Sequence, residues 1–352
     1  MKRLSSKEAL AVLAALVLLA GGGGLLGVHW LTAARNPIAR TCKEKGDSTF
    51  GCYEGYYDAL VARAGVAAAF ADLKAHYTTD PRIEVLCHAI THHIGRAAFT
   101  QYSGIAEAFA HGDDFCASGY YHGVLQGFSA GAGRGSLLAN LDAVCAGVPG
   151  KERHSLDYYN CVHGLGHGIM ALTGDSLFEA LRACDGLTGV VEQEACHNGV
   201  FMENLVVDGE HGGHYSRYLR PDEPLYPCTA VEPRYKVSCF EIQTSYALGA
   251  TQGDFVKVFA LCARVEPRFR ATCYQSLGRD ASTVSLNRVP ETVAKCNLGS
   301  DREQRSNCVR GAALDFIYFY HSDVQARQLC AALEPALRED CRSTVATTYR
   351  RF

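Results

Sequence analysis

The sequence predicts an all-α protein, in which about nine disulfide-stapled helical hairpins of about 34 residues form a solenoid after an N-terminal transmembrane helix. Three observations support this prediction. Residues 9–32 are uncharged and mostly apolar, all 16 cysteines follow residue 40, and those cysteines recur in closely spaced pairs. With 48% hydrophobic and 20% charged residues, the composition is typical of a folded globular chain.

The N-terminal segment is predicted to be a single-pass anchor in the cell membrane. Residues 1–8 contain three basic side chains, and the uncharged residues 9–32 follow directly. A helix of that length, at about 1.5 Å per residue, spans a bilayer core of roughly 30 Å. The basic residues place positions 1–8 in the cytoplasm, so that a linker at 33–41 leads to an extracytoplasmic domain at 42–352. The alternative is a cleaved signal peptide, which would leave a secreted or periplasmic protein.

The cysteines are interpreted as disulfides, because an even number at regular spacing in an exported chain is typical of a disulfide framework. Most have a partner 10 to 16 positions away. Cys87 and Cys116 have none, so we pair them with each other. The predicted bridges are Cys42–Cys52, Cys87–Cys116, Cys145–Cys161, Cys184–Cys196, Cys228–Cys239, Cys262–Cys273, Cys296–Cys308 and Cys330–Cys341.

The second cysteines of these pairs recur with a period that corresponds to one helical hairpin. They fall at positions 161, 196, 239, 273, 308 and 341, so that the step is close to 34 residues. Counting back through Tyr120, Cys87 and Cys52 extends the series to about nine hairpins. We expect the first cysteine of a pair to end one helix and the second cysteine to begin the next.

This period and hairpin form resemble tetratricopeptide and Sel1-like helical repeats over roughly residues 40–350. The resemblance implies a stack of hairpins with a concave inner surface. The Trp-x-x-Leu-Gly signature of such repeats is absent, and the one tryptophan, Trp30, lies in the predicted transmembrane segment. The resemblance therefore extends to the architecture and to no functional residue.

Polar residues recur at fixed places in the second helix of each hairpin. Positions two and six after the second cysteine share one helix face, and in the second to fourth hairpins this face is rich in histidine. Eleven of the 14 histidines lie between residues 88 and 214. Neutral imidazole is a common ligand of Zn, Cu and Fe. We therefore predict that His93, His122, His163 and His167 bind a transition-metal ion.

Other residues of this region receive supporting roles. Glu203 and Glu241 are the candidate carboxylate ligands or general bases. His88 and His92 form a second pair four residues apart, on the same predicted helix as His93 but at another angle. The residues predicted to lie behind the ligands or to close over them as a lid are His88, His92, His197, His211 and His214.

Two functions follow from these patterns. The first is a membrane-anchored, metal-binding extracytoplasmic protein, which can be a metal-dependent enzyme. The second is a scaffold or assembly factor that binds a peptide or protein on the concave face without a metal. A net charge of −3 favours no nucleic-acid partner. Metal content distinguishes the two functions.

Overall fold

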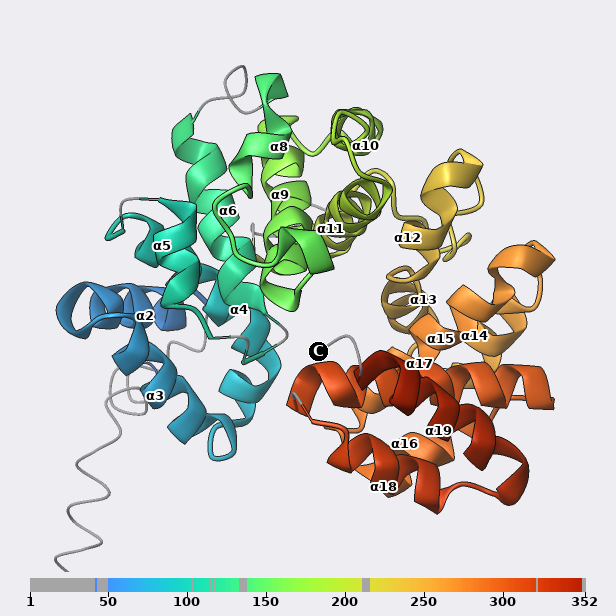
Figure 1. The fold of residues 1–352 in the computed structure, drawn as a ribbon. Coiled ribbons are helices and arrows are strands. Elements are labelled where there is room, and N and C mark those ends of the chain that lie inside the picture. Colours follow the sequence, from blue (N-terminus) through green and yellow to red (C-terminus); the bar gives the residue numbers. More distant parts are fainter. Residues whose placement is uncertain are drawn as a thin grey trace, which may run out of the picture. The chain divides into compact units, whose positions relative to one another are not determined.

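The computed structural model describes residues 42, 50–102, 104–113, 115–116, 118–132, 138–210, 216–320 and 322–349 (Figure 1). Every regular element in those ranges is a helix, which confirms the all-α prediction. The predicted segments 1–8, 9–32 and 33–41 lie outside the described residues, as do His211 and His214. None of the described helices combines the length and the hydropathy that a bilayer crossing requires.

The chain divides into two compact units, residues 1–56 and 57–352. Helix α2 (Phe50–Ala64) begins in the first unit, where Cys52 is bridged to Cys42. The second unit contains the remaining described helices and every residue of the candidate site.

Long helices alternate with shorter ones in the second unit. The long helices are α4 (Pro81–Phe99), α6 (Gly119–Ala132), α9 (Leu156–Leu172), α11 (Val190–Glu210), α15 (Pro267–Val284), α17 (Arg302–Tyr320) and α19 (Pro335–Tyr349). The shorter helices are α3 (Val66–Tyr77), α5 (Ile105–Ala110), α8 (Leu141–Val144), α10 (Leu177–Cys184), α12 (Lys236–Phe240), α13 (Thr244–Ala250), α14 (Phe255–Cys262), α16 (Val289–Cys296) and α18 (Val324–Ala332). Single turns of 3₁₀-helix lie at Lys151–Arg153 and Pro233–Tyr235.

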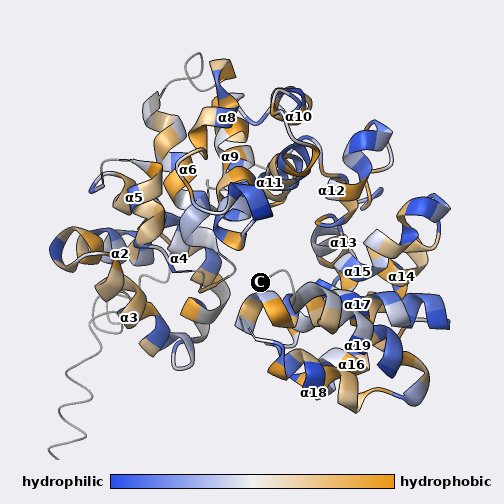
Figure 2. Ribbon diagram, viewed as in Figure 1, coloured by the Kyte–Doolittle hydropathy of each residue, from blue (hydrophilic) through white to orange (hydrophobic). Residues whose placement is uncertain are grey.

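Each long helix packs on the next long helix along the chain, except that the short helix α12 lies between α11 and α15. Helix α4 packs on α6, α6 on α9, and α9 on α11; α12 then contacts both α11 and α15, and α15, α17 and α19 follow in turn. Most helices carry hydrophobic and hydrophilic residues side by side (Figure 2), as amphipathic helices that bury one face do. The long helices therefore form a continuous series, as the hairpin period predicts, whereas the number of repeats stays a prediction.

All sixteen cysteines are bonded, in the eight pairs that the spacing predicts. In three pairs the first cysteine ends a short helix, as Cys184 ends α10, Cys262 ends α14 and Cys296 ends α16. The second cysteine does not begin the next helix, because that helix starts at an earlier signal. Helix α15 begins at Pro267, and Cys273 follows about two turns later. A bridge that closes a loop of this size contributes about 3 kcal/mol to stability in the loop-entropy estimate.

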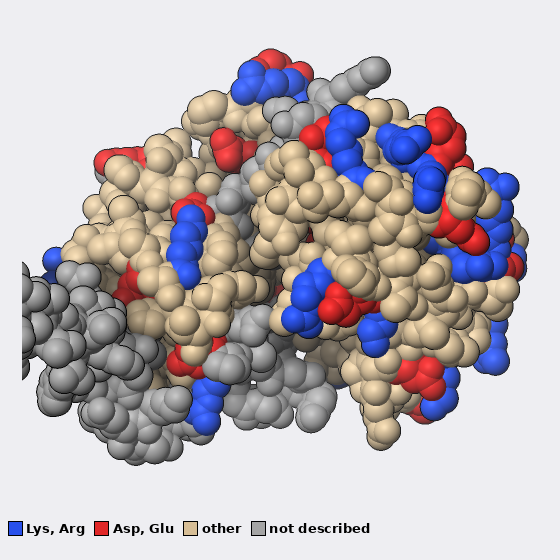
Figure 3. Space-filling model, turned by 90° about the horizontal axis from the view of Figure 1, so that it is seen from below, with Lys and Arg blue, Asp and Glu red and all other residues tan. Residues whose placement is uncertain are grey.

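Charged side chains add little to this stack. Acidic and basic side chains alternate over the face drawn in Figure 3. Ion pairs such as Lys236–Glu266 and Arg302–Asp340 join neighbouring elements at the surface. A surface ion pair contributes only about 0–1 kcal/mol. Apolar burial and the disulfides therefore account for most of the cohesion between hairpins.

Glycines let three pairs of long helices cross at close range. A Cβ atom on Gly123 of α6 would lie 1.9 Å from the carbonyl oxygen of His92 on α4. A Cβ atom on Gly199 of α11 would lie 1.9 Å from the carbonyl oxygen of His163 on α9. Gly311 of α17 makes the equivalent approach to α15. Only a residue without a side chain permits these backbone contacts.

Candidate metal centre

Five histidine side chains meet where α4, α6 and α9 pack against one another. His88 and His92 come from α4, His122 from α6, and His163 and His167 from α9. His92 and His167 are 0% exposed, and His122 and His163 are 3% and 5% exposed. Imidazoles are thus gathered in the interior of the second unit, away from bulk water.

These five side chains form two groups of three that share one member. One ring nitrogen from each of His88, His92 and His122 lies within 4.8 Å of the other two. The same holds for His122, His163 and His167. The ring of His122 also stacks on that of His167, with centroids 4.5 Å apart. Both groups bring three nitrogens close enough together to hold a metal ion.

The glycines of α9 explain how this helix approaches both of its neighbours. A Cβ atom on Gly168 would lie 2.1 Å from Oγ of Ser129 on α6. A Cβ atom on Gly166 would lie 2.2 Å from the carbonyl oxygen of Cys196 on α11. The histidines of α9 alternate with these glycines along the sequence. The close approach of the two helices therefore brings the ring of His163 into contact with the ring of His122 on α6.

Hydrogen bonds fix the tautomers of the two histidines on α4. Nδ1 of His88 lies 2.9 Å from the carbonyl oxygen of Cys116, which can only accept. Nδ1 of His92 lies 3.2 Å from Oε1 of Gln126. Arg96 donates to that same oxygen over 2.7 Å, so it is the oxygen of the amide that faces His92. Both Nδ1 atoms therefore carry the hydrogen, and both Nε2 atoms carry a lone pair.

The two Nε2 atoms of this pair face each other at 3.1 Å. Neither has a hydrogen to place between them, and two lone pairs at that distance repel each other. Burial lowers the pKa of His88 and lowers that of His92 well below its usual value. A proton is therefore a poor occupant of the gap, whereas a metal cation with two nitrogen ligands removes the repulsion.

The pair on α9 has a related arrangement. Nδ1 of His167 lies 2.5 Å from Oε2 of Glu203 on α11, and Nε2 of His167 lies 3.2 Å from Nε2 of His163. Burial lowers the pKa of His167, so the neutral ring donates its Nδ1 hydrogen to the carboxylate and turns its Nε2 lone pair inward. Gln126 donates to the same carboxylate over 3.4 Å and links the two halves of the cluster.

Two nitrogens of the cluster lack a hydrogen-bond partner. These are Nδ1 of His122 and Nδ1 of His163, both of which are buried. An unpaired buried polar atom costs about 1–3 kcal/mol. The chemistry of the donor set, with inward lone pairs and unpaired ring nitrogens, fits a transition-metal ion.

The structure does not bring His93 to the cluster. Its Nδ1 atom lies 3.9 Å from Oδ1 of Asp58 instead. The alignment of α4 with α9 explains the difference. Gly95 of α4 and Gly166 of α9 lie at equivalent helix crossings. His92 lies three residues before Gly95, and His163 lies three residues before Gly166, so His92 is the counterpart of His163. Our alignment by cysteines was therefore shifted by three residues in this helix. The shift arose because the alignment treated Cys87 as the second cysteine of a hairpin, whereas its bridge to Cys116 spans 29 residues and does not join the two helices of a hairpin.

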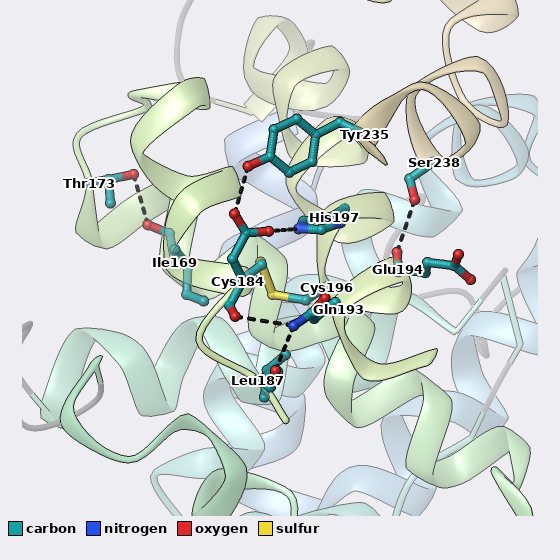
Figure 4. The surroundings of a disulfide bond; sticks show 11 residues. Ile169, Thr173, Cys184, Leu187, Gln193, Glu194, Cys196, His197, Tyr235 and Ser238 are labelled. Carbon is teal, nitrogen blue, oxygen red and sulfur yellow. Dashed lines mark hydrogen bonds and ion pairs between the residues drawn. A yellow bond between two sulfur atoms is a disulfide. The ribbon is translucent and has the colours of Figure 1, made fainter. Parts of the chain in front are cut away.

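His197 lies on the other side of α11, beside the Cys184–Cys196 bridge (Figure 4). Its Nε2 atom lies 3.0 Å from Oδ1 of Asp185. The hydroxyl of Tyr235 donates to Oδ2 of the same carboxylate over 2.7 Å. His197 thus helps to join α10, α11 and the turn before α12, and the structure shows no contact between it and the five histidines.

Glu241 lines a cavity of about 400 Å³ that His122 and His163 also line. One carboxylate oxygen accepts a hydrogen bond from Asn198 over 3.0 Å. The carboxylate is open to the cavity, but protein surrounds it on most sides, and this loss of hydration raises its pKa to about 7. Glu203, in contrast, is buried and bonded to His167.

The sequence reasoning missed two features of this cluster. It placed His88 and His92 behind the ligands, and it assigned no role to Gln126. The four-residue spacing of His88 and His92 is the same signal that singled out His163 and His167. Gln126 carried no comparable signal, because its contacts come from two other helices, α4 and α11.

The fold and the site together define a disulfide-rich, all-α chain with a buried histidine cluster that can hold a metal ion. Comparison with models of known protein families, with curated proteins and with solved structures finds no match to this chain. The resemblance to tetratricopeptide and Sel1-like repeats therefore stays a prediction.

Acidification is expected to destabilise the metal-free protein. Burial holds the pKa values of His92, His122 and His163 well below their usual value of 6.5. Below pH 6.5 the unfolded chain thus binds protons that the folded chain does not. These groups make their full contribution to the free energy of unfolding above pH 6.5. Below that pH, each imidazole that stays neutral in the folded state lowers the free energy of unfolding by about 1 kcal/mol per pH unit.

Urea unfolding in EDTA at pH 7 and pH 5 measures this effect. Because other groups also titrate in this window, the His163→Gln variant serves as the comparison. We expect its free energy of unfolding to fall less steeply with acidification than that of the wild type. An identical pH dependence in the two proteins would mean that His163 is protonated in the folded state.

Proposed function

We propose that this chain binds a transition-metal ion, Zn, Cu or Fe, at the five-histidine cluster, and that it does so in an extracytoplasmic compartment. The observation that carries the proposal is the pair of Nε2 atoms on α4, which face each other at 3.1 Å with no hydrogen to share. Two facing lone pairs are unfavourable in a buried site that holds no cation, whereas a cation bound by both nitrogens stabilises them.

The nitrogen separations support this proposal. Two nitrogens bound to one ion at about 2.1 Å lie about 3.0 Å apart at a right angle and about 3.4 Å apart at the tetrahedral angle. The Nε2 atoms are 3.1 Å apart in the α4 pair and 3.2 Å apart in the α9 pair. Both pairs are therefore spaced as two ligands of one ion, and His122 is in reach of either pair as the third.

The residues behind the cluster would hold the ligands in place. Glu203 accepts from Nδ1 of His167, and Gln126 accepts from Nδ1 of His92. Such contacts fix the tautomer of a ligating histidine and strengthen its lone pair. We therefore assign Glu203 a positioning role in place of the base role that the sequence suggested.

Glu241 is the carboxylate that we propose as a general acid or base if the site is catalytic. It faces the cavity that His122 and His163 line, and a pKa of about 7 suits proton transfer near neutral pH. A metal ion at the cluster would supply Lewis acidity or activate a bound water. The chain's own contribution is a buried set of imidazoles beside a cavity with one titratable carboxylate.

The eight disulfides support an oxidising, extracytoplasmic location. The proposal that the chain is tethered to the membrane rests on the apolar sequence of residues 9–32. Together these features describe a metal-binding domain held outside the membrane by an N-terminal helix.

Zinc titration of the metal-free, full-length chain tests the proposal with a matched pair of variants. His92 and His93 are neighbours on α4, but only His92 belongs to the cluster. If the ion lies in the α4 group, His92→Ala lowers the affinity at least about tenfold, and if it lies in the α9 group, His163→Ala does so. His93→Ala should bind as the wild type does.

If neither His92→Ala nor His163→Ala weakens zinc binding, or if His93→Ala weakens it equally, the proposed site is wrong. A protein that binds no metal under any of these conditions would favour the alternative, a scaffold that binds a peptide or protein partner. Circular dichroism at 222 nm establishes in parallel that each variant is folded.

A further inference from the structure

The cavity beside the cluster has the size and lining of a small-molecule site. It measures about 400 Å³, and the long helices α9, α11, α15 and α17 contribute to its wall, together with Glu241 and Ile242, which follow α12. Cavities that bind small molecules are typically 300–1,000 Å³ in volume. The apolar and aromatic part of the wall is formed by Leu156, Tyr159, Met202, Leu314, Tyr318 and Phe319.

The charged part of the wall has an excess of carboxylates. Glu241 and Asp315 both line the cavity, and Arg279 is the one basic side chain among the lining residues. The guanidinium of Arg279 is already paired with the neighbouring Asp280, to which it donates from Nε over 3.2 Å and from Nη2 over 2.6 Å. The same guanidinium also acts electrostatically on Glu241 and Asp315, so three carboxylates surround one positive charge and a negative excess remains.

Loss of hydration acts on both of these carboxylates. It raises the pKa of Glu241 to about 7 and that of Asp315 to about 6. Each accepts one hydrogen bond from a neutral side chain, Asn198 for Glu241 and Ser282 for Asp315. A positive group on a ligand in the cavity would add to the charge that Arg279 already supplies to these carboxylates.

Several hydrogen-bond donors of the wall already have acceptors within the protein. Asn198 donates to Glu241 over 3.0 Å, and Asn160 donates to Ser118 over 3.2 Å. Gln275 donates to Asn307 on α17 over 3.2 Å. The carboxylate oxygens of Glu241 and Asp315 add acceptors to the same wall. A complementary ligand therefore brings donors.

We propose that this cavity binds a small organic cation, with its ammonium group on the part of the wall that Glu241 and Asp315 form and its apolar portion against the aromatic and aliphatic wall. Tyrosine and phenylalanine rings add to the attraction, because an aromatic face attracts a cation. This site adjoins the histidine cluster but does not depend on a bound metal.

Calorimetric titration of the full-length, EDTA-treated chain tests the proposal with three probes of nearly equal shape. Benzylamine is the cation, benzyl alcohol is the neutral analogue and benzoate is the anion. We expect benzylamine at pH 7.5 to bind at least about tenfold more tightly than the other two. Weaker or equal binding of benzylamine, or no binding of benzylamine, overturns the proposal.

Two variants locate the binding site. Glu241→Gln and Asp315→Asn keep the shape of the side chain and remove the charge, and each should lower the benzylamine affinity at least about fivefold. Glu303→Gln, on the exposed side of the same helix as Asp315, should change nothing. Unchanged affinity in both cavity variants places the cation elsewhere and overturns the proposal.

The histidine variant separates this proposal from the metal proposal. His167→Ala should lose metal affinity while the metal-free protein still binds benzylamine, since His167 does not line the cavity. Failure of benzylamine binding alone leaves the metal site standing, and failure of metal binding alone leaves the cation site standing.

Discussion

Replacing His122 with alanine is expected to lower the affinity of the chain for the proposed transition-metal ion at least about 100-fold. His122 is the one histidine that belongs to both groups of three nitrogens. Its loss leaves either group with only two imidazoles, whichever of them holds the ion. No other single substitution in the cluster removes a ligand from both groups.

Competition between the protein and a chromophoric zinc chelator measures this affinity. His111→Ala is the control, because His111 ends α5 and stacks on Tyr102 at 4.4 Å, away from the cluster. His122→Asn, which retains a polar side chain, separates the loss of a ligand from the loss of packing. A His122→Ala protein that binds zinc within about threefold of the wild type would exclude the cluster as the binding site.

Replacing Gly199 with alanine is expected to lower the free energy of unfolding by about 3 kcal/mol. The new Cβ atom would lie 1.9 Å from the carbonyl oxygen of His163 and 2.9 Å from its carbonyl carbon. Both atoms belong to the backbone of α9, so no side-chain rotation relieves the clash and the two helices must separate. Because His163 and His167 lie on the displaced helix, metal affinity should fall as well.

Gly249→Ala is the matched control for this substitution. Gly249 also lies inside a helix, α13, but a Cβ atom there meets no atom within 4 Å. We expect this change to be neutral or to stabilise the protein by up to about 1 kcal/mol, because alanine favours the helix. Urea unfolding of both variants gives the comparison, and equal stability of the two would show that the α9–α11 crossing is looser than described.

The hairpins could be predicted because the spacing of the cysteine pairs equals the spacing of the hairpins. A disulfide between residues about a dozen apart requires the chain to turn back, and the recurrence of such pairs requires the turn to repeat. Seven of the eight bridges follow from that spacing, and the Cys87–Cys116 bridge follows by elimination. The start of each long helix could not be read from the same signal, because a cap or a proline such as Pro267 fixes it independently.

The cluster could be predicted in part. His163 and His167 lie four residues apart in one helix, so their meeting is a local property of the sequence. The choice of His93 over His92 depended on aligning α4 with α9, and that alignment is decided by the helix crossings at Gly95 and Gly166. The spacing of residues in the sequence does not show where two helices cross, because a crossing depends on how two separate helices pack against each other.

Metal content is the most direct measure of the central claim that the facing imidazoles share a cation. The full-length protein, purified without an affinity tag, is analysed by inductively coupled plasma mass spectrometry before and after dialysis with equimolar zinc. We expect about one tightly held transition-metal ion per chain in the wild type and none in His122→Ala. Wild-type protein that contains no metal and takes up no zinc would contradict the claim.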